Sequence, residues 1–279
     1  MKKIYYITAV FATLFLVGCG DGIDLPGVNV ETDLNKIPLP DNNVNLEQVE
    51  LKPSTEPKLH EGLHTEEDFQ RIRDKKAAGE EPWVSAYQLL VESQFSQKTA
   101  DTYPTEWIKR GISGDENYMN AARGATIVYQ QALRWKIEQD DEYAAKAVEN
   151  LNKWVQTCVG VTGNTNLSLA AGLYGYEFAI AGELLRDYGG WDRADFAAFQ
   201  NWLLKVFYPA NDDFLKRHHD TNALHYWANW CLCNIAAKMA IGIVTDRRDI
   251  YNEGIAHLQT GDTNGRLRRA IYHDYAPDY

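Results

Sequence analysis

The sequence has no surplus of positive charge. Its 28 Lys and Arg residues stand against 39 Asp and Glu residues, which gives a formal net charge of −11 at pH 7. Nucleic acid needs a basic surface, so this balance argues against DNA or RNA as a partner. Any other polyanion would be repelled by the chain as a whole. It could bind only where basic residues gather locally.

Cysteine is scarce as well, with four residues in the chain. One of them, Cys19, belongs to an N-terminal signal. Cys231 and Cys233 are two positions apart in a stretch that we expect to be helical, so they point to different faces and are poorly placed to pair or to hold one metal ion. The three remaining thiols, which include Cys158, do not make a disulfide framework. We expect them to be small buried apolar residues.

The sequence also lacks an uncharged apolar run long enough to span a membrane comfortably. Residues 4–17 form an apolar run without charge, directly after Lys2 and Lys3. This length and these flanks are typical of a signal peptide. Residues 16–19 (LVGC) then resemble the lipobox of bacterial lipoproteins, in which the signal is cut before the cysteine and that cysteine is lipidated. We therefore expect a signal peptide at 1–18 and export to the periplasm, the outer membrane or the cell surface. A lipid on Cys19 would anchor the protein to a membrane.

Proline becomes rare after residue 60. Five of the nine prolines fall within residues 20–60, among Asp, Asn and Gly, and neither a helical nor a strand period persists there. This composition predicts a flexible tether over 19–60. The remaining residues, 61–279, are enough for one large domain with its own core.

The domain is rich in helical periodicity. Apolar residues step by three and four between Ala121 and Trp135 and again between Ala144 and Cys158, and only an acidic turn separates the two runs. This pattern predicts an antiparallel helix pair. Thr65 is followed by three acids, which is typical of a capped helix start. Further helices are expected at about 167–187, 193–206, 222–243 and 248–258, and we find no convincing strand. The fold class is therefore all-α, built of helical hairpins that can stack into a solenoid, a bundle or a closed α/α toroid.

Polar residues cluster where the helix expected at 222–243 begins. On a helical wheel one stripe carries, in order, Asn222, His225, Tyr226, Asn229 and Cys233. This stripe would lie either at one end of a cavity, walled by the flanking Trp227 and Trp230, or on a solvent-exposed helix start. Pattern alone does not decide between them.

Two basic segments stand out in this acidic chain. One covers residues 216–220 (KRHHD), and the other begins with Arg266 and places three Arg within four residues just before Tyr272 and His273. Lys109 and Arg110 add a third basic site, in a helix-poor stretch at about 94–115 that is either a lid or a plain surface loop.

These residue types suit uronate β-elimination. That reaction removes a proton next to a carboxylate, so the site must neutralise the carboxylate with Asn, His or Arg, as an oxyanion site does. A base must take the proton and an acid must protonate the leaving oxygen; a Tyr near an Arg can do both. A hydrolase would instead need two opposed carboxylates. The acids available are Glu183, Asp212, Asp213 and Asp220, without an evident pair. A metal site would need a ligand spacing, and none of a recognised kind occurs among the His and Asp residues.

Two segments resemble a known family. Residues 222–230 (NALHYWANW) are similar to the catalytic Asn/His segment of polysaccharide lyase family 5 and related alginate-lyase domains, and residues 269–276 (RAIYHDYA) are similar to the segment that carries their catalytic Tyr. Weaker similarities lie at 63–68 and 181–186. The resemblance spans about 60–279. It implies an α/α toroid and a metal-independent, cofactor-free lyase that acts on alginate or a similar polyuronate.

The resemblance also implies site residues. Tyr272 would be the base and acid, and His225 with Asn222 would neutralise the carboxylate. Because the family has Asn and His adjacent, whereas two residues separate them in this chain, Asn229 is an alternative for the Asn role. Arg266 would assist, with Arg268 as the alternative. From the residues themselves, and not from the resemblance, we expect Trp227, Asn229, Arg269, Lys109 and Arg110 to bind the substrate.

The family continues with more helices after the Tyr segment, whereas this sequence ends at Tyr279. We therefore expect a C-terminally incomplete domain, with an open toroid. The alternative function is a lipid-anchored glycan-binding protein on the same scaffold, without catalysis. Its aromatic rings, from eight Trp and 16 Tyr residues, would stack on sugars in either case.

Overall fold

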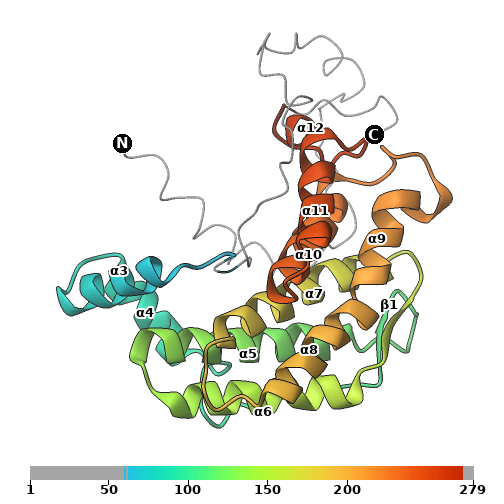
Figure 1. Ribbon diagram of the computed structural model, residues 1–279. Coiled ribbons are helices and arrows are strands. Elements are labelled where there is room, and N and C mark those ends of the chain that lie inside the picture. Colours follow the sequence, from blue (N-terminus) through green and yellow to red (C-terminus); the bar gives the residue numbers. More distant parts are fainter. Residues whose placement is uncertain (1–59, 61, 273–279) are drawn as a thin grey trace. The chain divides into compact units, whose positions relative to one another are not determined.

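The computed structural model describes residue 60 and residues 62–272, with side chains up to residue 271 (Figure 1). All of them fall in one of the two units into which the chain divides, Leu39–Tyr279. The expected signal peptide, Cys19 and nearly all of the expected tether lie outside the described residues. In the part that is described, no helix is both long enough and apolar enough to cross a membrane.

The described chain is mostly helical, as expected. Its first hairpin is α3 (Glu66–Ala77) and α4 (Trp83–Glu92). Thr65 caps α3 as predicted: its hydroxyl accepts from the Asp68 amide, and the Asp68 carboxylate accepts from the Thr65 amide. The later helices are α5 (Tyr118–Glu138), α6 (Asp141–Thr157), α7 (Leu167–Leu185), α8 (Arg193–Val206), α9 (Tyr208–Arg217), α10 (Ala228–Val244), α11 (Arg248–Thr260) and α12 (Leu267–Tyr272). The predicted α5–α6 pair and the predicted helices at α7, α8 and α11 are confirmed.

Helices α5 and α7 run in the same direction. Tyr118, the first residue of α5, stacks on Tyr174 in the first half of α7, with ring centroids 6.5 Å apart. Further along both helices, the Thr126 hydroxyl donates to a Glu177 oxygen over 3.0 Å. Pairs that follow the same order on both helices require a parallel arrangement.

Helix α10 runs parallel to α7 on its other side. Near the starts, Gly172 leaves so little room that a Cβ there would lie 2.6 Å from the Cys233 sulfur. At the far ends, the Arg186 guanidinium donates to the carbonyls of Ile243 and Val244 over 3.0 and 2.9 Å. Helices α5, α7 and α10 thus form one parallel layer, and the helices between them return the chain. We call these three the inner helices.

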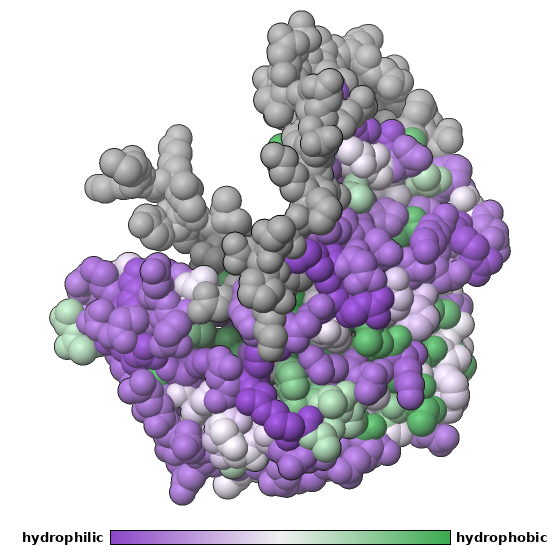
Figure 2. Space-filling model, viewed as in Figure 1, coloured by the Kyte–Doolittle hydropathy of each residue, from purple (hydrophilic) through white to green (hydrophobic). Residues whose placement is uncertain are grey.

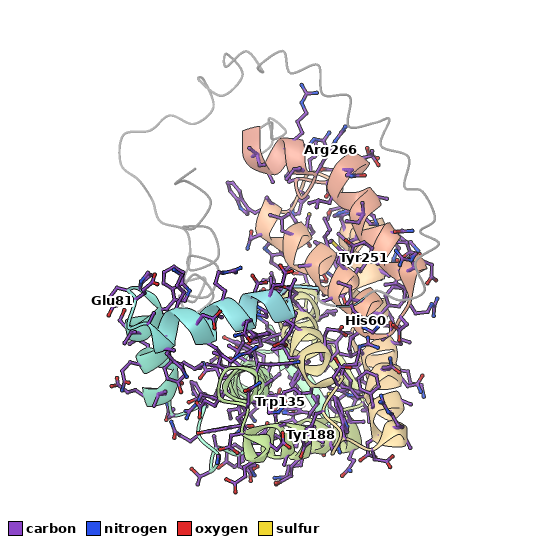
Figure 3. The ribbon with its side chains drawn as sticks, turned by 60° about the vertical axis from the view of Figure 1, so that its left-hand side comes forward. His60, Glu81, Trp135, Tyr188, Tyr251 and Arg266 are labelled. Carbon is purple, nitrogen blue, oxygen red and sulfur yellow. The ribbon has the colours of Figure 1, made fainter. Side chains whose placement is uncertain are left out.

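An aromatic core packs behind α7. Phe178 contacts Trp154, Trp202 and Phe207, with ring centroids between 5.2 and 6.1 Å apart. All four side chains are buried. Near the C-terminal ends of α5 and α7, Trp135 meets Tyr188 edge to face (Figure 3). The contacts of Phe178 fix α7 against the α6 and α8 side and leave its other faces for α5 and α10.

Two short strands that the sequence analysis missed form a small parallel sheet. β1 (Trp107–Arg110) pairs with β2 (Gly160–Gly163), and Ile108 faces Val161. Four residues are too few to show alternation, and β2 begins and ends with glycine. Figure 2 shows hydrophobic residues gathered on the side where β1 and α8 lie, within a largely hydrophilic face.

The sheet also limits the lid hypothesis for residues 94–115. Ile108 is fully buried and β1 is bonded to β2, so Lys109 and Arg110 belong to the scaffold. Only the exposed residues on either side of β1 remain available as a lid, and Tyr103 among them is 75% exposed.

The prediction that a helix starts at 222 is wrong, because α10 starts at Ala228. Residues 221–227 form turns instead. The Asn222 side-chain oxygen accepts from the Leu224 amide over 2.9 Å, an Asx turn that competes with helix formation. The helical stripe that joined Asn222, His225 and Tyr226 therefore does not exist.

Candidate functional site

The three inner helices begin at the same end of their layer and leave that end without side-chain caps. The residues before them, Asn117, Asn166 and Trp227, make no side-chain capping bond, and no acid stands in any of the three first turns. By contrast α6 and α8 are capped by Asp140 and Asp192 and carry acids in their first turns. The positive ends of the inner helix dipoles are therefore not neutralised by side chains of their own.

Arg110 lies at this end of the layer. Its guanidinium stands over the Tyr118 ring, 4.6 Å from the centroid, and its buried Nη1 has no hydrogen-bond partner among the described residues. Burial raises the pKa of Tyr174, and the nearby Arg110 charge opposes this shift. Lys109 differs sharply, because its ammonium pairs with the Asp115 carboxylate at 2.6 Å. Of these two predicted binding residues, Arg110 is the one whose charge is not already neutralised.

A left-handed turn brings a histidine to the start of α7. His218, His219 and Asp220 have φ values of 49°, 53° and 61°, a conformation that costs each non-glycine residue about 1 kcal/mol or more. The turn places the His219 Nε2 atom 2.8 Å from the Ser168 hydroxyl, and the Tyr226 ring meets the His219 ring at 5.8 Å. Three such residues in a row are an outlier that points to function. Sequence analysis did not select His219, although it belongs to the basic segment 216–220.

The residues singled out around 222–230 lie on the surface. Asn222, His225 and Asn229 keep part or most of their surface in solvent, and Trp227 is 57% exposed. His225 contacts the neighbouring Tyr226 ring at 5.0 Å. Of the two alternatives left open for this segment, the structure shows the solvent-exposed one.

The turn just before the second basic segment packs against the loop at 221–227 and the first part of α10. The buried Asn264 amide donates to the carbonyls of Leu224 and Tyr226 over 2.9 and 3.0 Å. A Cβ on Gly265 would lie 2.4 Å from the Cβ of Cys231. The loop that carries His225 is thus tied to the turn that leads into α12.

The arginines of this segment make backbone contacts. Arg266 donates from Nε to the Gln259 carbonyl over 3.2 Å, and Arg269 donates to the Asp262 carbonyl. Figure 3 shows Arg266 at the end of the molecule where α11 and α12 meet. Tyr272 ends α12, and its side chain lies outside the described residues. Its placement against His225 stays a prediction.

We expect the Asn264 tether to matter for both stability and activity. In Asn264→Ala two hydrogen bonds are lost, and two loop carbonyls lose their partner. Each bond contributes about 1 kcal/mol, so the free energy of unfolding should fall by about 2 kcal/mol. Because the loop would then hold His225 less firmly, kcat should fall about tenfold. Thermal unfolding and steady-state kinetics measure the two effects. Asn152→Ala, which removes a surface bond to Asp195, is the control and should change neither.

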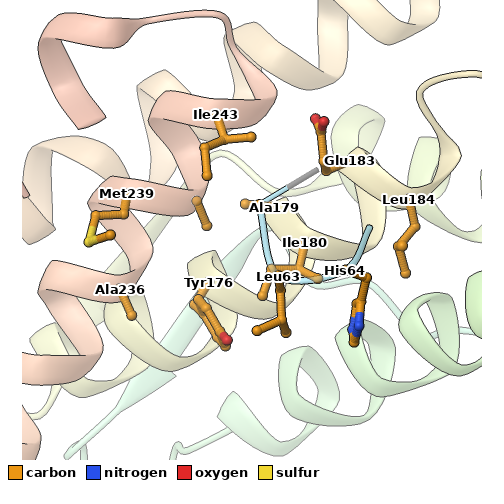
Figure 4. A pocket seen from close by; sticks show the side chains of 12 residues that line it. Leu63, His64, Tyr176, Ala179, Ile180, Glu183, Leu184, Ala236, Met239 and Ile243 are labelled. Carbon is orange, nitrogen blue, oxygen red and sulfur yellow. The ribbon is translucent and has the colours of Figure 1, made fainter. Parts of the chain in front are cut away.

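A cavity of about 220 Å³ lies elsewhere, between α7 and α10 (Figure 4). The segment Gly62–His64 forms one of its walls. Its lining is mainly aliphatic, with His64, Tyr176 and Glu183 as the polar groups. None of the predicted site residues is among the described residues that line it. This lining suits apolar groups rather than a charged sugar.

The carboxylates considered for a hydrolase are all engaged in ion pairs. Glu183 pairs with Arg186 at 2.8 Å and Asp212 pairs with Lys238 at 2.8 Å. Asp213 and Asp220 both pair with Arg217. Within residues 62–271, no group of three or more His, Cys, Asp or Glu side chains is arranged to hold a metal ion.

Comparison with known proteins adds one match. Residues 72–270 match the protein-family model described as "Alginate lyase". The match includes the second half of α3 and all of α4 to α11, with β1 and the loop at 222–227. No curated protein matches the chain.

Proposed function

The chain belongs to the alginate lyase family, and on that premise we propose that it cleaves an acidic, uronate-containing polysaccharide by metal-independent β-elimination. The observation that carries the proposal is Arg110. In a chain with a net charge of −11, it is a partly buried cation without a carboxylate partner among the described residues, at the end where three helix dipoles present their positive poles. That end would attract and neutralise a uronate carboxylate.

The chemistry assigns a role to each group. With its carboxylate held by a guanidinium, the sugar loses its neighbouring proton more readily, because the developing negative charge is stabilised in place. Asn222 and His225 would share this role. Tyr272 would take the proton and then protonate the leaving glycosidic oxygen, which keeps the proton count balanced.

The contacts of the four cations support a different choice of carboxylate-binding residue from Arg266, which the resemblance implies. Arg269 and Arg266 donate to backbone carbonyls, and Lys109 is paired with Asp115. Arg110, by contrast, still has an Nη1 donor without a partner among the described residues, which a carboxylate could accept from. We therefore assign carboxylate binding to Arg110 first and a supporting role to Arg266. His219 joins His225 as a candidate histidine because it lies on Ser168 at the start of an inner helix.

The architecture proposed for the domain is an open α/α toroid. The parallel inner helices with antiparallel return helices support it, since such hairpins arranged in an arc line a central cleft with their inner helices. We further propose that the protein is exported as a lipoprotein, anchored through Cys19 and facing the periplasm or the outside. The support is the sequence of residues 1–19.

A non-catalytic glycan-binding protein is the second candidate. The exposed Trp227, beside the His225 loop, favours it, since an accessible indole is a stacking surface for sugar rings. This function needs no proton transfer and so would not depend on Tyr272.

The two candidates are separated by incubation with polymannuronate, polyguluronate and polyglucuronate, with a neutral glucan as control. The lyase should generate unsaturated uronate ends, seen by their ultraviolet absorbance, from at least one acidic polymer. It should spare the glucan. Retention of a polyuronate on the immobilised protein without any unsaturated product would favour the binding protein instead.

A further inference from the structure

The contact line between α5 and α7 holds a carboxyl group that the reaction described above does not use. We call Thr126, Tyr129, Tyr176 and Glu177 the α5–α7 seam. All four side chains keep partial solvent exposure, so the seam is open to solvent along part of its length. Tyr176 and His64 also border the cavity between α7 and α10 (Figure 4).

Glu177 has no cation beside it in the described chain. One carboxyl oxygen accepts from the Thr126 hydroxyl over 3.0 Å, and the other has no hydrogen-bond partner there. No Lys or Arg of the described residues forms an ion pair with Glu177, in contrast with Glu183 on the same helix, which pairs with Arg186. Burial among protein atoms raises the pKa of Glu177 to about 7. The carboxyl group therefore keeps a proton well above the usual range for Glu.

The groups around Glu177 add no charge that would hold its anion. Tyr129, Tyr174 and Tyr176 are phenols whose pKa values burial raises, and Glu177 raises them further. His64 shares a short 2.6 Å contact with the Tyr129 hydroxyl, and burial lowers its pKa, so it is neutral at pH 7.

The other described elements that pack around α7 near Glu177 are apolar. Toward α10, the cavity wall is made of small and apolar residues, and behind α7 lies the aromatic core around Phe178. Two cations flank the seam: Arg110 beyond Tyr174, and Arg123, exposed one turn before Thr126 on α5.

We propose that Glu177 is a substrate-binding residue that acts in its protonated form, donating its O–H to the carboxylate of a second uronate unit along the α5–α7 seam. This inference rests on the proposed function, since it needs a polyuronate. Each unit of such a polymer carries a carboxylate. While Arg110 holds one at the N-terminal end of the inner helices, the α5–α7 seam itself presents no cation to the next unit, although Arg123 flanks it on α5.

The protonated form of Glu177 suits a neighbouring carboxylate better than the ionised form. An O–H donor makes a short, strong hydrogen bond to a carboxylate. An ionised Glu177 would instead place two like charges together at a site where protein atoms exclude much of the water. The bound state therefore carries a proton on Glu177, and binding above pH 7 must take that proton from solution.

The first test is the pH dependence of KM for polyuronate cleavage. In the wild type, KM should be flat below pH 6 and should rise by up to about tenfold per pH unit above pH 7. Glu177→Gln keeps an N–H donor and does not titrate, so its KM should stay flat and near the low-pH value. Glu149→Gln, which alters a surface carboxylate paired with Lys153 on α6, is the control and should keep the wild-type profile. A Glu177→Gln enzyme with the wild-type rise in KM would overturn the proposal.

The second test does not depend on any change at Glu177. A mannuronate trimer is titrated into Tyr272→Phe protein, which slows turnover, in buffers of different ionisation enthalpy. Binding should take up close to one proton per trimer at pH 8 and almost none at pH 5.5. Binding without proton uptake at pH 8 would refute the role of Glu177 and leave the lyase proposal intact. Absence of both binding and cleavage in the wild type would instead refute the lyase proposal, and the inference with it.

Discussion

Replacing Arg110 with alanine should lower kcat/KM on a polyuronate by about 100- to 1,000-fold. The reason is that its Nη1 atom is buried without an acceptor in the described structure, at the end where three helices start without side-chain caps or acids in their first turns. Losing one preorganised donor to a developing negative charge typically costs about 3–4 kcal/mol of transition-state stabilisation. Because the side chain packs on Tyr118 rather than in an ion pair, the fold should keep most of its stability.

The neighbouring Lys109 supplies a matched control. It precedes Arg110 on the same strand, but its charge is held by Asp115 at 2.6 Å on the surface. Lys109→Ala should therefore change kcat/KM by less than about threefold, in keeping with the small energies of exposed ion pairs. Arg110→Lys should recover only part of the loss, since a guanidinium binds a carboxylate through two parallel bonds and an ammonium does not. Equal losses in Lys109→Ala and Arg110→Ala would show that general charge, and not this site, governs binding.

Replacing Lys238 with methionine should lower the free energy of unfolding by about 3 kcal/mol. The Lys238 side chain is fully buried on α10, and its ammonium pairs with Asp212 of α9 at 2.8 Å and with Glu253 of α11 at 2.7 Å. Methionine fills a similar volume, so the loss comes from the two carboxylates: Glu253 loses its ion pair with Lys238, and Asp212 keeps the exposed Lys216 as its cation. Breaking a buried pair from one side costs about 3–5 kcal/mol. We take the lower end because Glu253 is 43% exposed and water can replace part of the interaction.

Lys216 tests this interpretation at the same carboxylate. It also pairs with Asp212 at 2.8 Å, but its side chain is 60% exposed. Lys216→Met should change the free energy of unfolding by no more than about 1 kcal/mol. Urea unfolding of both variants gives the comparison. If the two variants lost the same stability, burial would not be what makes the Lys238 interaction strong.

The sequence predicted those parts of the fold in which one helix face is apolar throughout. The α5–α6 pair, α8 and α11 show such faces, and α7 is apolar and buried almost all round. An apolar face can be recognised in the sequence without knowing which element packs against it. Helix α9 was not predicted, since its short sequence YPANDDFLKR is mostly polar and contains a proline. The late start of α10 was not predicted either. It depends on the Asx turn at Asn222 and on three left-handed residues, which leave no periodic trace.

The site was less predictable, because charge state depends on partners that are distant in the sequence or in the fold. Lys109 and Arg110 are adjacent and alike in sequence, yet only one has a carboxylate partner among the described residues, which is decided by where β1 points each side chain. His219 became a candidate only when the chain folded it onto Ser168, 51 residues away. Glu177 is one of many acids in the sequence, and its environment comes from Thr126 on another helix.

Cleavage of polymannuronate, polyguluronate and polyglucuronate in water enriched in ¹⁸O tests the central claim most directly, because it separates elimination from hydrolysis. Elimination breaks the glycosidic bond without adding water, so mass spectrometry should find unsaturated ends and, before the new reducing ends exchange their anomeric oxygen with water, no ¹⁸O in the products of the polymer that is cut. The account predicts this result for the wild type, and strongly reduced product for Arg110→Ala at equal protein concentration. Saturated products that carry one ¹⁸O per cleavage would contradict it, as would no cleavage of any of the three polymers.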